Sequence, residues 1–262
     1  MRSDPWQMLR FVVAGAEFDN FSFELANEAE LAAFLARILS CEEAEIWSYM
    51  REAKADPGLT TDLWRRLRWR LDYTRRPPLG RRLTWYVLAR ALTPKLVVET
   101  GVQDGLGSLA LLRALDHNAR EGFPGRLISF DTLPTAGWLV APSERASWRL
   151  VTGSSVERMP DVLAGEASVE LFFQDSGGDF ELASGELRLV LAHASASAVY
   201  VSQAQRPALA AFADQQGLRY HAFYHRSFKH VIPGSEMGFA FDAGAVTAQG
   251  RRSSRSRSDP RD

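Results

Sequence analysis

The chain has 262 residues, of which 46% are hydrophobic and 24% charged, a composition typical of a globular protein with a sizeable core. The net charge of −1 excludes a globally basic nucleic-acid binder, and a single cysteine excludes intrachain disulfides and cysteine-built zinc sites. No apolar run reaches the length of a membrane span and the N-terminus has no secretory signal pattern, so we expect a cytoplasmic protein.

Apolar residues recur every three to four positions through the first third of the chain, which is typical of amphipathic helices. The pattern predicts two helices within 20–55, a third from Thr60 or Thr61, and a fourth that Pro94 ends. We interpret residues 1–79 as an N-terminal helical cap.

After Pro94 short apolar runs alternate with helical segments. The predicted strands are 96–98, 127–130, 148–151, 169–173, 198–201, 219–224 and 237–241. Alternation up to residue 216 indicates βαβ units and a parallel sheet, whereas the short connection between the last two strands favours an antiparallel pair. We therefore predict a doubly wound, Rossmann-like α/β domain over 80–242, with five parallel strands and a terminal antiparallel pair.

Small polar and acidic residues follow the predicted strands. They are Glu99, Thr100, Gly101, Asp131, Gly153, Ser154, Asp175, Ser176, Ser202 and Gln203. Ligands of open α/β sheets bind at the carboxyl ends of the strands, where a carboxylate can accept hydrogen bonds from ribose hydroxyls or an ammonium group. The glycines after the first strand are spaced Gly-x-x-x-Gly-x-Gly, which departs from the dinucleotide fingerprint and disfavours a nicotinamide dehydrogenase.

The stretch 97–108, together with Asp131 after the second strand and Asp175 after the fourth, resembles class I S-adenosylmethionine-dependent methyltransferases. The order of elements over 80–242 is similar as well, and within the class the chain looks most like bacterial small-molecule O-methyltransferases of biosynthetic pathways. The resemblance implies S-adenosylmethionine as cofactor and a small-molecule acceptor methylated at oxygen.

The resemblance also implies roles for individual residues. The methionine part of the cofactor would be held by Glu99, Gly101, Gly105 and Ser108. Asp131 would bind the ribose, Ser154 would complete the cofactor site, and Asp175 would lie between cofactor and acceptor.

The catalytic base is less clearly marked. Many relatives have a histidine after the fourth strand, whereas this chain reads Asp-Ser-Gly-Gly-Asp over 175–179. Besides Asp175, the candidates are Asp179 and His225, which we expect in the loop between the last two strands. Their simpler roles are helix capping for Asp179 and an exposed loop position for His225. We expect no catalytic metal, because Ser202 stands where metal-dependent relatives often have an acid.

Arginines alternate with tryptophans over 64–70, a pattern that can bind nucleic acid. The simpler interpretation places Trp64 and Leu67 in the core and the arginines in solvent or against the acidic residues of 17–56. The Arg/Ser-rich tail, 243–262, is expected to be disordered. Nucleic acid is not the expected partner, and the cap is a candidate homodimer contact. Two alternatives stay open: a catalytically silent cofactor-binding or partner protein of the same fold, and an RNA-directed methyltransferase.

Overall fold

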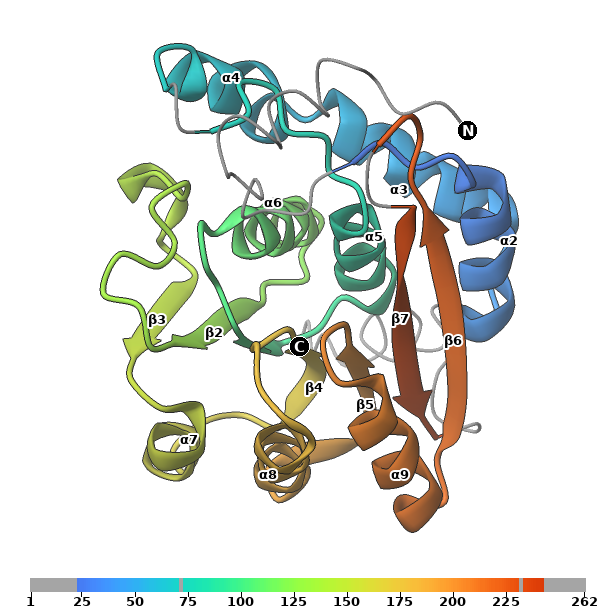
Figure 1. Cartoon of the computed structure of the whole chain (residues 1–262), viewed down its shortest axis with the longest axis vertical. Helices are drawn as coiled ribbons and strands as arrows, with labels where there is room; N and C mark the ends of the chain where they lie inside the picture. The colour runs from blue at the N-terminus through green and yellow to red at the C-terminus, as the bar shows by residue number, and fades with distance from the viewer. Residues whose placement is uncertain (1–22, 71–72, 231–232, 243–262) are drawn as a thin grey trace, which may run out of the picture.

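A seven-stranded sheet forms the centre of the molecule in the computed structural model, which describes residues 23–70, 73–230 and 233–242 (Figure 1). The strands are β1 (Leu96–Thr100), β2 (Arg126–Asp131), β3 (Trp148–Thr152), β4 (Val169–Gln174), β5 (Ala194–Ser202), β6 (Arg219–Arg226) and β7 (Gly234–Phe241). Their order is β3-β2-β1-β4-β5-β7-β6. β1 to β5 are parallel, and β7 pairs antiparallel with both β5 and β6. The predicted fold class is thus confirmed. The tail predicted for 243–262 lies outside the described residues.

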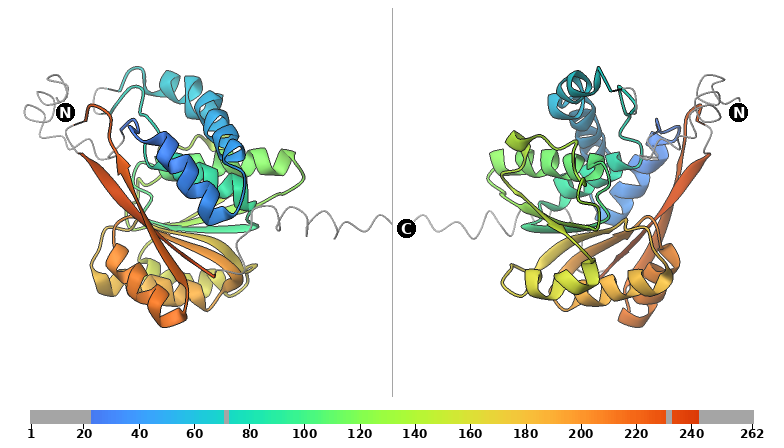
Figure 2. Two further views of the ribbon diagram at one scale, coloured as in Figure 1. Left: turned by 90° about the vertical axis from the view of Figure 1, so that its right-hand side faces the viewer. Right: turned by 60° about the vertical axis from the view of Figure 1, so that its left-hand side comes forward.

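Helices cover both faces of the sheet. They are α2 (Glu28–Leu39), α3 (Glu43–Ala55), α4 (Thr61–Leu67), α5 (Arg82–Leu92), α6 (Leu106–Arg120), α7 (Ser155–Leu163), α8 (Phe180–Leu191) and α9 (Arg206–Gln216), with short 3-10 turns η1 (Pro57–Leu59) and η2 (Pro142–Glu144). Figure 2 shows α2 to α6 on one face and α7 to α9 on the other. Within the described residues, no helix is both long and apolar enough to cross a lipid bilayer.

Two hydrophobic cores follow from the alternation of side chains along the buried strands. In β1, which is buried at every position, Val97 packs into the core shared with α5 and α6. Its neighbour Val98 packs into the opposite core, formed with α7, α8 and α9. This alternation decides which helix layer each polar residue near the carboxyl end of a strand will meet.

The last two strands are longer than the sequence pattern predicts. β6 runs to Arg226 and β7 begins at Gly234, with His225 directly opposite Ser235. The expected loop position of His225 is therefore wrong: the residue belongs to β6 and is fully buried. Polar and aromatic residues of β6 hid the strand, because half of its positions face away from the core.

Charged residues fasten the cap to the domain. Arg90 Nε on α5 lies 2.5 Å from Glu52 Oε1 on α3, and Arg113 Nε on α6 lies 2.9 Å from Asp56 Oδ1. His117 Nε2, also on α6, is 2.9 Å from Asp56 Oδ2. Burial opposes ionisation of both carboxyls, but the hydrogen bonds from the arginines outweigh it and hold the pKa of Glu52 and of Asp56 below the ordinary range.

Candidate functional site

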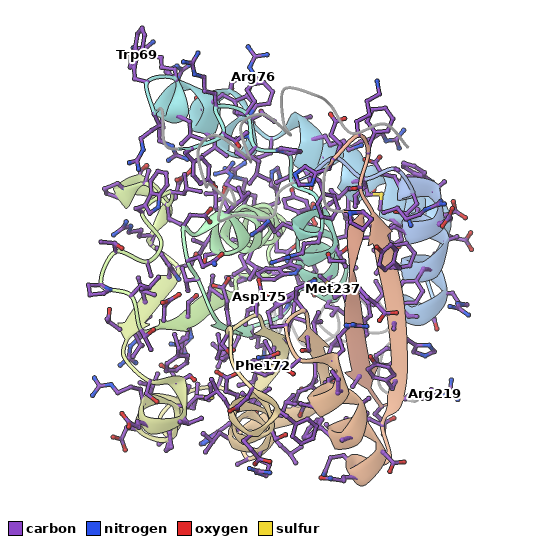
Figure 3. All side chains as sticks on the ribbon, in the orientation of Figure 1. Trp69, Arg76, Phe172, Asp175, Arg219 and Met237 are labelled. Carbon is purple, nitrogen blue, oxygen red and sulfur yellow. The ribbon has the colours of Figure 1, made fainter. Side chains whose placement is uncertain are left out.

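A cavity of about 350 Å³ opens at the carboxyl ends of β1, β2, β3 and β4. Four of the residues that the sequence predicts at a cofactor site line it: Gly101, Asp131, Ser154 and Asp175. Figure 3 shows Asp175 near the middle of the molecule, at the end of β4. Parallel strands bring their carboxyl ends to one edge, so residues up to 74 positions apart in the chain share one wall. We name this space the strand-end cavity.

Asp131 holds the turn after β1 in place. Its Oδ2 accepts hydrogen bonds from the backbone N–H groups of Val102 (2.7 Å) and Gln103 (2.9 Å). Its Oδ1 accepts one from Leu133 N (2.8 Å). A carboxylate offers about four acceptor positions, so one remains on Oδ1 for a donor in the cavity.

Asp175 is bound by an arginine that the sequence analysis did not single out. Nη2 of Arg81 lies 3.0 Å from Oδ2 and 3.5 Å from Oδ1 of Asp175. Both side chains are largely buried, with exposed fractions of 8% for Arg81 and 15% for Asp175. The arginine directly precedes α5, so this pair joins the cap side of the molecule to the end of β4.

Glu99 and Ser108 lie beneath the cavity and not in its wall. Oε2 of Glu99 accepts hydrogen bonds from Ser108 Oγ and Ser129 Oγ, each at 2.6 Å, under the first turn of α6. Gly105 precedes that helix as its N-cap residue. Burial raises the pKa of Glu99 to about 7, although the two hydroxyl groups favour the ionised form.

This raised pKa makes a stability prediction for Glu99→Gln. The pKa is above that of the unfolded chain, so wild-type stability falls as pH rises from about 4.5 to about 7. The glutamine variant has no such carboxyl. We expect its unfolding free energy to exceed that of the wild type by an amount that grows over this range and levels off near about 3 kcal/mol.

Urea unfolding of both proteins between pH 5 and pH 8 measures the difference. Glu157→Gln, which replaces an exposed glutamate on α7, is the matched control and should stay within about 0.5 kcal/mol of the wild type. A difference that is constant across the series, or that shrinks with rising pH, would contradict a buried Glu99 of raised pKa.

A second buried carboxylate, which sequence reasoning missed, links three of the loops around the cavity. Glu186 on α8 is fully buried and accepts hydrogen bonds from Thr100 Oγ1 (3.1 Å), Ser155 Oγ (2.6 Å) and Ser176 Oγ (2.8 Å). These hydroxyls belong to the ends of β1 and β4 and to the start of α7. Glu186 lies on the buried face of α8 with Ala183, and this apolar stripe was the available signal.

The other two candidate bases lie in simpler settings. Oδ1 of Asp179 accepts a hydrogen bond from Leu182 N (2.9 Å) and caps α8, which confirms the capping interpretation. Nε2 of His225 is 2.8 Å from Thr84 Oγ1 on α5. Burial lowers the pKa of His225 to about 3, so its imidazole is neutral at pH 7. Across the described ranges, no three His, Cys, Asp or Glu side chains converge on a common metal position.

A second and larger cavity, of about 570 Å³, lies between the cap and α5. Its lining is mostly apolar and includes Leu25, Leu59, Trp64, Pro77, Pro78, Leu79, Gly80, Leu83 and Phe228. We name it the cap cavity. Gly80, one of its lining residues, is followed in the chain by Arg81, the partner of Asp175.

The arginine-rich segment lies at the far end of the cap. Leu67 is buried, as predicted, while Trp69 is 80% exposed. Arg65 binds Asp62 and Arg66 binds Glu144, so the expected pairing with residues 17–56 is wrong for these two. Figure 3 shows Trp69 and Arg76 well apart from Asp175. This surface is therefore separate from the strand-end cavity.

Comparison with known proteins gives a family match and structural neighbours. Residues 98–202 match the model of a methyltransferase domain. No curated protein matches the chain. The O-methyltransferase TomG from Streptomyces achromogenes, involved in tomaymycin synthesis and solved with SAM, is 16% identical with a TM-score of 0.53, over 88% of this chain and 99% of that one. Cofactor-bound Rv0187 from MTB is 17% identical with a TM-score of 0.53, over 84% and 99%. At this identity the neighbours show the fold alone, and the family match confirms the resemblance drawn from the sequence.

Proposed function

Residues 98–202 are a methyltransferase domain, and from this premise we propose that the chain transfers a methyl group from S-adenosylmethionine to an oxygen atom of a small molecule. The observation that carries the proposal is the strand-end cavity, in which Asp131 and Asp175 face one space of about 350 Å³. We further propose that the work is biosynthetic and cytoplasmic, and that residues 1–79 form the cap of a catalytic domain at 80–242.

The residues of the strand-end cavity fit this cofactor. Asp131 has one acceptor position left for a ribose hydroxyl. Carboxylates at the edge favour a cationic ligand, and S-adenosylmethionine carries a sulfonium and an ammonium group. When bound, it supplies an electrophilic methyl group. Gly101 and Ser154 would line its path, while Glu99, Gly105 and Ser108 would shape the turn that holds the methionine part.

The acceptor would come from the cap side. The cap cavity is large enough for a small organic molecule and its lining is mostly apolar, as ligand pockets usually are. Asp175 and Arg81 lie between this cavity and the strand-end cavity, where acceptor and methyl group must meet. Residues of the chain would thus align the two reactants and exclude water from them.

Calorimetric titration of S-adenosylhomocysteine into the wild type and into Asp131→Ala tests the cofactor assignment. We expect binding by the wild type and a loss of at least about 100-fold in the variant, because the variant loses both the ligand contact and three bonds that hold the turn. Asp161→Ala, at an exposed position on α7, should bind like the wild type.

The outcomes separate the candidate functions. Equal binding by Asp131→Ala and the wild type would move the cofactor away from the strand-end cavity. Failure of the wild type to bind would remove the methyltransferase function and favour a partner protein of the same fold. Binding by the wild type followed by methylation in an acceptor screen with labelled S-adenosylmethionine would establish the enzyme.

A further inference from the structure

Arg81 lies at the boundary between the two cavities. Gly80, its neighbour in the chain, lines the cap cavity, and Asp175, its ion-pair partner, lines the strand-end cavity. With 8% of its side chain exposed, the arginine is a buried cation at this boundary. An acceptor that reaches from the cap cavity toward the strand-end cavity therefore meets the guanidinium.

The guanidinium has hydrogen-bonding capacity to spare. It carries five N–H donors, and its contacts with Asp175 both come from Nη2. Nε is buried and has no acceptor among the described residues. Gln203 Oε1 and Ser235 Oγ, at the same edge of the sheet, are also buried without a partner in the part of the chain that the structure describes. Buried polar atoms without partners are uncommon, so these groups point to a polar ligand.

The charged groups around Arg81 are accounted for by other contacts. Arg82 is fully buried beside it, and burial, together with the neighbouring Arg81, lowers the pKa of Arg82. Asp104 accepts hydrogen bonds from the Tyr73 hydroxyl and from Leu106 N. His225, the remaining titratable group nearby, is the neutral histidine bound to Thr84. Arg81 thus faces the boundary as a cation with one carboxylate partner.

The sequence candidates for a base do not provide a free one here. Asp179 caps α8, His225 is buried against α5, and Asp175 is ion-paired. What the structure does supply at the boundary is a fixed positive charge. A fixed charge promotes reaction by stabilising an anion and not by removing a proton.

We propose that Arg81 binds the acceptor oxygen as an anion, so that the acceptors of this methyltransferase are phenols, enols or carboxylic acids and not aliphatic alcohols. This inference rests on the proposed function and names its substrate class. The acceptor loses its proton to water on binding. Its oxyanion then donates an electron pair to the methyl carbon, the new O–C bond forms, and the C–S bond breaks with its electron pair remaining on sulfur. Anion and sulfonium cation disappear together, so charge balances.

The test uses 4-nitrophenol, whose phenolate is coloured, with the full-length protein saturated with S-adenosylhomocysteine. Spectrophotometric titration gives the acid dissociation constant of the bound phenol. We expect the wild type to increase this constant about tenfold over the free phenol. Arg81→Met should abolish the increase, and Arg81→Lys, which keeps the charge without the planar fork, should retain part of it. Arg120→Met removes an exposed arginine on α6 and should behave like the wild type.

Each result decides between the two levels of the proposal. No binding of S-adenosylhomocysteine by the wild type would overturn the proposed function itself. Cofactor binding with 4-nitrophenol unbound, or bound with an unchanged dissociation constant, would overturn the role of Arg81 alone. An equal increase in Arg81→Met would do the same. If Arg81→Met fails to bind S-adenosylhomocysteine, the comparison of Arg81→Lys with the wild type decides: retention of part of the increase supports the proposal, and none overturns it.

Discussion

Replacing Gly101 by alanine is expected to cost at least about 4 kcal/mol of unfolding free energy and to abolish binding of S-adenosylhomocysteine. The glycine has a φ of +81°, which a residue with a Cβ adopts only under strain. A Cβ here would also lie 2.4 Å from the carbonyl oxygen of Asp175 and 2.6 Å from Ser176 N. Both are backbone atoms, so the ends of β1 and β4 would have to move apart, and the cavity between them would change shape.

Gly177→Ala is the matched control for this prediction. Gly177 lines the same cavity, but a Cβ at this position would meet no atom within 4 Å. We expect the control to change stability by less than about 1 kcal/mol and to bind S-adenosylhomocysteine normally. Chemical denaturation and calorimetry measure the two effects. Similar behaviour of both variants would mean that the close approach of β1 and β4 is not needed for the site.

Replacing Glu186 by leucine is expected to cost about 3 kcal/mol or more and to weaken binding of S-adenosylhomocysteine at least about tenfold. The leucine would leave the hydroxyls of Thr100, Ser155 and Ser176 without their shared acceptor. These hydroxyls fix the loops on three sides of the strand-end cavity, although Glu186 itself does not line it. The variant should therefore lose affinity through loop mobility and not through a lost ligand contact.

Glu186→Gln separates this effect from a simple loss of packing. The amide keeps an oxygen that accepts from two hydroxyls and gains an N–H₂ group that can donate to the third. We expect a stability change below about 1 kcal/mol and near-normal affinity. A glutamine variant as damaged as the leucine variant would show that the negative charge, and not the hydrogen-bond geometry, organises the loops.

Local sequence signals predicted the fold well because each strand of the parallel sheet is a short apolar run between a helix and a polar turn. They also brought Asp131 and Asp175 to one edge, since this edge follows from topology alone. They could not predict that Glu99 would lie beneath α6, because the direction of a side chain at a strand end depends on which helix layer it meets. They placed His225 outside β6, because pairing with β7 is a long-range contact.

The partners of polar residues were the least predictable part of the site. Arg81 meets Asp175 across 94 positions of the chain, and Glu186 meets Thr100 across 86. No local pattern encodes such pairs. The arginine-rich segment drew attention to 64–70, whereas the arginine that reaches the site lies after the Pro77-Pro78 pair, in a stretch without a recognisable motif.

The ion pairs between cap and domain limit how the protein can be recombined. Glu52 and Asp56 belong to the cap, but their partners Arg90 and Arg113 belong to α5 and α6. A chimera that exchanges the cap at residue 79 would leave Arg90, with 2% of its side chain exposed, facing a foreign helix. Buried cations without partners are strongly destabilising. The crossover that keeps these pairs intact lies after α6, so the unit of inheritance extends beyond the cap into the first βα unit of the sheet.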